Sequence, residues 1–91
     1  MAKNIRITKA NQIAINEIVI SKNDLEHYDN RRLFASKNGD TELAELYDKV
    51  YQTALKTWSA QCNLLAKMNN MDFTDLVTSE NYHTMVDAAS N

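Results

Sequence analysis

The chain has 91 residues with no proline and one glycine, and its 10 basic and 12 acidic side chains give a net charge of −2. This length predicts a single domain over residues 1–91, and the scarcity of glycine and proline disfavours folds with many tight turns and glycine-rich phosphate loops. The balanced charge is unlike that of a basic nucleic-acid binder. The single cysteine, Cys62, cannot form an internal disulfide and indicates a reducing compartment.

The first twenty residues allow two interpretations. Ile5 and Ile7 alternate, as do Ile13 and Ile15, and this pattern of β-branched residues is typical of a strand. In a helix capped by Thr8, however, the apolar residues keep three- and four-residue spacing. A two-stranded hairpin alone would be marginal in water, so we favour a short N-terminal helix and keep the strand as the alternative.

A helical hairpin is expected over the next fifty residues. Ser21 and Asp24 resemble a capping box, which predicts a helix from Lys22 to about Lys37. In the turn that follows, over residues 36–41, Gly39 can take the left-handed conformation without steric cost. Asp40 or Thr41 can then cap the next helix.

The helix after the turn is the best supported element. From residue 41 to about residue 70, apolar side chains recur at steps of three and four, which predicts one long amphipathic helix. Asp72 is then expected to cap a short turn over residues 73–77, and Ser79 a last helix over residues 80–89 with Met85 facing inward. The predicted fold class is therefore all-α, with a helical hairpin and short N- and C-terminal helices.

The length of this helix predicts self-association. About 30 helical residues measure roughly 45 Å, whereas a compact 91-residue domain is only about 32 Å across. The helix should overhang a monomer, and a second copy is the simplest cover for its wide apolar face. We expect a homo-oligomer whose interface includes Tyr47, Val50, Tyr51, Ala54, Trp58 and Leu65. A bent or shorter helix in a monomeric bundle is the alternative.

The residue pattern does not support several classes of function. The two histidines and Cys62 lack metal-ligand spacing. The paired carboxylates lie where helix capping explains them, and acids in the first turns of the long helix disfavour DNA binding. We therefore expect no enzyme, metal, cofactor or DNA partner. No apolar run is long enough to span a membrane and no secretory signal is visible, so the cytoplasm is the expected location.

The densest polar cluster covers residues 27–32. Tyr28 and Arg32 lie one helical turn apart, with Arg31 beside them. An aromatic ring next to guanidinium groups suits a flat base that carries a phosphate. The alternative is that Arg32 pairs with Asp29 or Tyr28 on a solvated face.

The segment Ala54-Leu55-Lys56-Thr57-Trp58-Ser59-Ala60, together with the turn Lys37-Asn38-Gly39-Asp40, resembles the small phage anti-CBASS proteins that act as cyclic-oligonucleotide sponges. The likeness covers roughly residues 22–70. It implies an all-helical homo-oligomer, a hexamer, that holds cyclic oligonucleotides at subunit interfaces without cleaving them and so deprives a host immune effector of its signal. It also implies a phage-encoded protein in the host cytoplasm. The chain departs from this family in having no aromatic residue before Tyr28.

Because the ligand residues of that family do not align onto this chain, we predict the binding residues from side-chain chemistry. Tyr28 would stack on a base, and the phosphate contacts would come from Arg31, Arg32, Lys22, Arg6 and Lys9. The alternative function is a small helical adaptor or inhibitor that binds a host protein through an apolar helix face.

Overall fold

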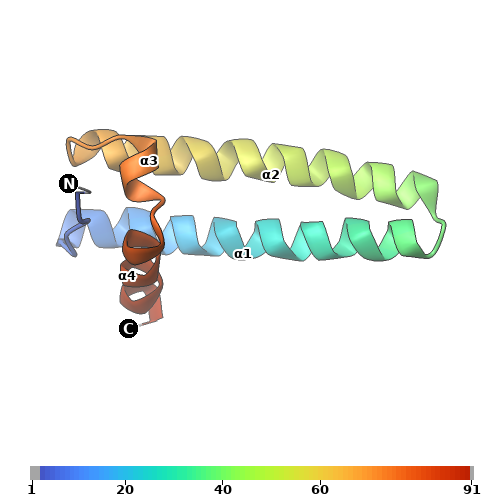
Figure 1. Ribbon diagram of the computed structural model, residues 1–91, viewed down its shortest axis with the longest axis horizontal. Coiled ribbons are helices and arrows are strands. Elements are labelled where there is room, and N and C mark those ends of the chain that lie inside the picture. Colours follow the sequence, from blue (N-terminus) through green and yellow to red (C-terminus); the bar gives the residue numbers. More distant parts are fainter. Residues whose placement is uncertain (1–2, 91) are drawn as a thin grey trace.

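The computed structural model describes residues 3–90, which form an all-α fold (Figure 1). Helices α1 (Lys9–Lys37) and α2 (Thr41–Met68) lie side by side and antiparallel, whereas α3 (Phe73–Leu76) and α4 (Ser79–Ser90) gather at the end where α2 finishes. The described chain extends over 45 × 25 × 22 Å. The predicted helical hairpin is therefore confirmed, and its long axis exceeds the diameter expected of a compact chain of this size.

Helix α1 is a single helix of 29 residues. The hydroxyl oxygen of Thr8 accepts the N–H of Asn11 at 3.1 Å, which confirms the helical interpretation of the N-terminal region. The predicted helix start at Ser21 is wrong, because the backbone continues through it. Ile18 and Ile15 are fully buried about one and two turns before Ser21, so tertiary packing keeps this stretch helical despite its β-branched residues.

The turn between the two long helices is confirmed. Gly39 has a φ of 73°, in the left-handed region that glycine favours. The carboxylate of Asp40 then accepts the N–H of Leu43 at 3.1 Å and caps α2. At the other end of α2, Asn70 takes a φ of 56° and reverses the chain, a role for which asparagine is the usual substitute for glycine.

The caps of the last two helices confirm one prediction and correct another. Asp72 is the N-cap of α3, and the carboxylate of Asp75 accepts its N–H at 3.1 Å. The predicted cap at Ser79 is wrong, because Ser79 already belongs to α4. Thr78 takes that role, since its hydroxyl oxygen accepts the N–H of Asn81 at 3.2 Å.

The hydrophobic core lies where all four helices meet, at the base of the hairpin. Its buried members are Ile5, Ile15, Ile18, Cys62, Leu65, Ala66, Met71, Leu76 and Met85. Trp58 extends this core toward the turn and meets the ring of Phe73 edge to face, with 5.8 Å between centroids. Since each large buried aliphatic side chain contributes about 1.5–3 kcal/mol, the base carries most of the apolar stabilisation. The half of the hairpin nearest the turn exposes far more of its surface.

Within residues 3–90, no helix combines the length and the apolarity that a bilayer crossing requires.

Candidate functional site

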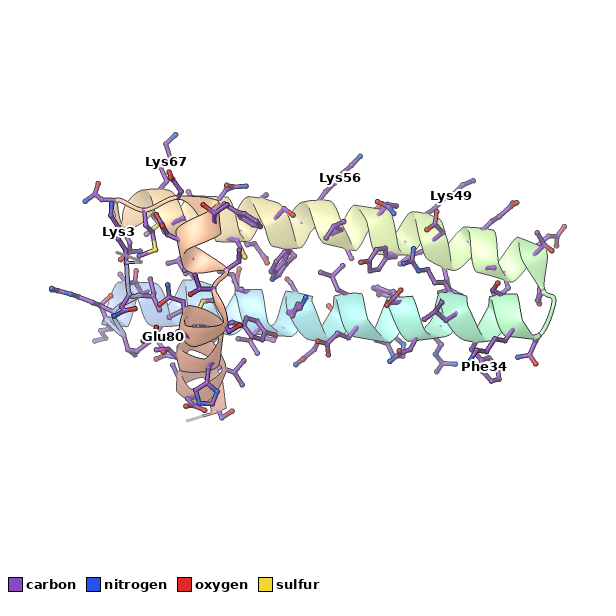
Figure 2. The ribbon with its side chains drawn as sticks, viewed as in Figure 1. Lys3, Phe34, Lys49, Lys56, Lys67 and Glu80 are labelled. Carbon is purple, nitrogen blue, oxygen red and sulfur yellow. The ribbon has the colours of Figure 1, made fainter. Side chains whose placement is uncertain are left out.

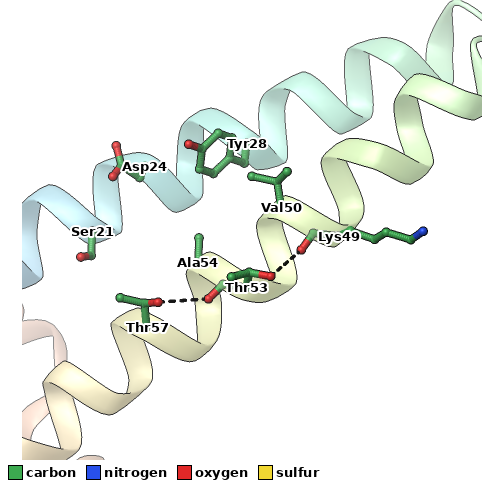
Figure 3. A pocket seen from close by; sticks show the side chains of 8 residues that line it. All are labelled: Ser21, Asp24, Tyr28, Lys49, Val50, Thr53, Ala54 and Thr57. Atoms are coloured by element: carbon green, nitrogen blue, oxygen red, sulfur yellow. Dashed lines mark hydrogen bonds between the residues drawn. The ribbon is translucent and has the colours of Figure 1, made fainter.

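A groove of about 430 Å³ runs between α1 and α2 near the middle of the hairpin (Figure 3). Its lining residues are Ser21, Asp24 and Tyr28 of α1, and Lys49, Val50, Thr53, Ala54 and Thr57 of α2. The groove exists because Ser21 and Ala54 are too small to fill the space between two facing helices.

The polar groups of the groove are mostly neutral hydroxyls. Two of them are engaged as donors by their own helix, since Thr53 donates to the Lys49 carbonyl at 3.1 Å and Thr57 donates to the Thr53 carbonyl at 3.3 Å. The side chain of Lys49 is directed away from the other lining residues (Figure 3). Asp24 places a carboxylate on the α1 edge. A phosphate group would therefore meet a negative charge at this edge and no inward-directed lysine.

The groove continues along α2 as an uncharged row that we call the α2 stripe. Its members are Leu43, Leu46, Val50, Thr53, Thr57 and Leu64. They are separated by steps of three, four and seven residues, so they share one helix face. Leu46 is 56% and Leu64 is 62% exposed. Lys49, Lys56 and Lys67 project from the neighbouring edge of α2, away from α1 (Figure 2).

Arg32, a predicted phosphate ligand, is held within the chain. Its guanidinium donates to Asp29 at 2.8 Å and to Asp48 of α2 at 2.7 Å, and it lies 4.2 Å from the centre of the Tyr51 ring. Burial lowers the pKa of Arg32, but the hydrogen bonds to both carboxylates outweigh this effect and raise it. The pairing with Asp29 that the sequence left open is present, and Arg32 ties α1 to α2.

The other predicted ligand residues are not brought together. The ammonium of Lys22 lies 4.9 Å from the centre of the Trp58 ring, a cation–π contact within the chain. Arg6 and Lys9 are exposed at the base of the hairpin, and Lys9 lies about 28 Å along α1 from Tyr28. Tyr28 lines the groove and Arg31 is exposed three residues later.

The six predicted interface residues fall into two groups. Leu65 is fully buried in the core, and Tyr51 and Trp58 contact Arg32 and Phe73 of the same chain. The other three, Tyr47, Val50 and Ala54, are half-buried, and the last two line the groove.

The predicted interface residues did not include Leu46 and Leu64, which are exposed members of the α2 stripe. Their signal was a second apolar spacing on α2, beside the row that packs against α1. Leu46 lies four residues before Val50, and Leu64 lies seven residues after Thr57.

The part of the chain that the structure describes contains neither a metal site nor a reactive thiol. No group of three His, Cys, Asp or Glu side chains there could hold a metal ion. Cys62 is fully buried, and this burial raises the pKa of its thiol to about 11. Such a thiol stays protonated and unreactive at neutral pH.

Comparison with protein-family models, with curated proteins and with solved structures gives no match for this chain.

Proposed function

We propose that this protein is a small helical adaptor or inhibitor that binds an amphipathic helix of another protein. The binding surface is the α2 stripe together with the adjoining groove. The observation that carries this proposal is the set of exposed leucines on the α2 stripe, Leu43, Leu46 and Leu64, whose fellow members Val50, Thr53 and Thr57 carry no charge. A helix face that only meets solvent is normally polar, and an exposed apolar row is typical of an interaction surface.

The charges beside the stripe define the chemistry of the partner. Lys49, Lys56 and Lys67 follow the stripe along most of its length and extend into solvent (Figure 2). A partner helix would lay its leucine-rich face on the stripe, in the helix-in-groove mode of recognition. Its flank over the lysines would be acidic, because complementary charges speed association and exclude other partners.

A peptide titration followed by NMR tests the proposal. One synthetic helix carries leucines at i, i+3, i+4 and i+7 with glutamate flanks, and a matched helix has lysine flanks instead. We expect the acidic peptide to bind more tightly and to shift the amide signals of residues 43–64. Leu46→Glu and Leu64→Glu should each weaken binding about tenfold or more.

Leu33→Glu is the matched control, because it adds the same charge at an exposed leucine of α1. It should leave the affinity for the acidic peptide unchanged. Shifts spread over the whole chain, or an affinity that Leu64→Glu does not alter, would contradict the proposal.

Nucleotide sequestration is a second candidate, supported by Tyr28 on the groove and the exposed Arg31 one turn later. In this proposal the ring stacks on a base and the guanidinium contacts a phosphate of a cyclic oligonucleotide. Native mass spectrometry with cyclic di- and trinucleotides tests it. A multimer that gains mass in steps of one cyclic nucleotide would support sequestration. A protein whose mass does not change in the presence of the nucleotides would refute it.

A further inference from the structure

We propose that α1 is a dimerisation helix. Two copies of this chain pair antiparallel along the outer edge of α1, and Phe34 of each copy enters a pocket between α1 and α4 of the other. This interface lies on a different helix from the α2 stripe, so both stripes of the dimer stay free for a partner.

The outer edge of α1 carries a seven-residue repeat. Ile13, Ile20, His27 and Phe34 occupy one position of the repeat, and Asn16, Asn23 and Asn30 follow each of the first three members by three residues. Ile13, Ile20 and Phe34 are 68%, 61% and 67% exposed. Phe34 points away from α2 (Figure 2). Apolar residues thus occupy three of the four members of this repeat, and an apolar seven-residue repeat on an exposed helix edge favours pairing with another helix.

A pocket of about 460 Å³ lies on the same edge, near the base of the hairpin. It is lined by Asn16, Val19, Ile20 and Asn23 of α1 and by Ala89 and Ser90 of α4. Helix α4 crosses α1 and continues past it, so its last turn forms a wall beside the edge (Figure 1). The pocket thus combines apolar side chains, Val19, Ile20 and Ala89, with polar ones, Asn16, Asn23 and Ser90.

Phe34 cannot reach the pocket of its own chain. It lies 14 residues after Ile20 on one straight helix, which is about 21 Å along the edge. The same separation suits an antiparallel copy. With a two-fold axis near residues 24–25, Phe34 of one copy comes level with Asn16 of the other, at the end of the pocket that Asn16 lines. Both pockets are then filled by the same symmetric contact.

The charges beside the repeat agree with this register. Glu17 lies seven residues before Asp24, and Arg31 lies seven residues after it. A two-fold axis at Asp24 brings Glu17 of each copy level with Arg31 of the other, which gives two ion pairs, while the two Asp24 side chains face each other across the axis. A parallel pair would instead place Phe34 against Phe34 and leave both pockets unfilled. The apolar contact and the charges together select the antiparallel dimer.

The size of this contact sets the expected affinity. The repeat from Ile13 to residue 37 is about 36 Å long, and one helix is about 10 Å wide. The strip therefore buries roughly 400 Å² on each copy, about half of what a standard stable interface buries. We expect a reversible dimer with a dissociation constant in the micromolar range.

Sedimentation velocity over a concentration series, from about 1 to 500 µM, measures this equilibrium. The 10.4 kDa chain should shift to a dimer of about twice that mass. Phe34→Ala should raise the dissociation constant about tenfold or more. We expect circular dichroism to show that the variant keeps its helices, because the replaced side chain is largely exposed. Leu64→Ala, an equally exposed site on α2, should dimerise like the wild type.

A charge exchange tests the register itself. Glu17→Arg and Arg31→Glu should each weaken the dimer by about two- to fivefold for every ion pair lost, and the double variant should regain the wild-type affinity. A wild type that stays monomeric at 500 µM, a Phe34→Ala variant as tight as the wild type, or a double variant weaker than both single ones would overturn the proposal. The peptide-binding experiment is independent, since Phe34→Ala leaves the α2 stripe intact.

Discussion

Asn11 on α1 and Asn69 at the end of α2 exchange two side-chain hydrogen bonds across the open end of the hairpin. Asn11 donates to Asn69 at 2.9 Å, and Asn69 donates back at 3.1 Å. Each amide uses its second N–H on a backbone carbonyl, that of Arg6 for Asn11 and that of Leu65 for Asn69. Asn11 is buried and Asn69 is half-buried. Because all four side-chain N–H groups of the pair have partners, it fixes the register of the two long helices at the end opposite the Gly39 turn.

Removal of either amide should destabilise the fold. Asn11→Ala leaves the Asn69 side chain without its reciprocal partner, and we expect a loss of about 2 kcal/mol in the free energy of unfolding. A double-mutant cycle with Asn69→Ala, measured by urea unfolding, should give a coupling of about 1 kcal/mol or more. Asn63→Ala is a control, because that exposed amide bonds only within α2, to the carbonyl of Ser59. Strictly additive effects would show that the two amides do not act as a pair.

Asn81 of α4 joins the N-terminal segment to the core. It is 1% exposed; it accepts the N–H of Ile5 at 2.9 Å and donates to the carbonyls of Lys3 and Asp75, both at 2.8 Å. We expect Asn81→Leu to cost about 3 kcal/mol, since three backbone groups lose their partner. Hydrogen exchange at the Ile5 amide should accelerate more than exchange in the middle of α2. Uniform acceleration at both places would mean that Asn81 only contributes to global stability.

The buried thiol predicts a pH dependence. The pKa of Cys62 rises from 9.0 to about 11 because burial disfavours the thiolate. The folded state therefore keeps its proton at a pH where the unfolded state has lost it. This contribution to stability is complete below pH 9 and is lost as the pH rises toward 11.

Urea midpoints between pH 8 and 11 check this expectation. The midpoint of the wild type should fall more steeply above pH 9 than that of Cys62→Ala, which has no thiol to ionise. At pH 8 an aromatic disulfide reagent should modify the native protein no faster than it unfolds. Rapid modification of the folded protein would contradict the burial of this thiol.

The sequence predicted those parts of the fold that depend on a few neighbouring residues. Thr8, Gly39 and Asp40 act through their own backbone or through an N–H three residues away, so their roles follow from local chemistry. The continuity of α1 through Ser21 depends instead on where Ile15 and Ile18 are buried. These side chains are buried only when α2 and α4 are packed against α1, so no local sequence pattern predicts their burial.

The contacts of the candidate site likewise include some that neighbouring residues predict and some that depend on the fold. Asp29 is near Arg32 in sequence and was a foreseeable partner, whereas Asp48 comes from the facing helix and only the folded hairpin supplies it. The repeat that contains Ile13, Ile20 and Phe34 was present in the sequence. It differs from the predicted oligomer interface, which was placed on the wider apolar face of α2.

Arg31 and Arg32 are neighbours with different roles, and alanine variants should separate them. Arg32→Ala loses the contacts with Asp29, Asp48 and Tyr51, and we expect the protein to lose about 1 kcal/mol of stability. Arg32→Lys should recover only part of this loss, because an ammonium cannot reproduce the planar fork. Arg31→Ala should change stability by less than about 0.5 kcal/mol.

Thermal unfolding followed by circular dichroism measures these differences. The gap between Arg32→Ala and the wild type should narrow at high salt, because the ion pairs with Asp29 and Asp48 are partly exposed and therefore screened. The stacking contact of Arg32 with Tyr51 should persist at high salt. The difference in melting temperature between Arg32→Ala and the wild type should therefore become smaller without disappearing. Equal stabilities of all three variants at low salt would show that Arg32 does not tie the two helices together.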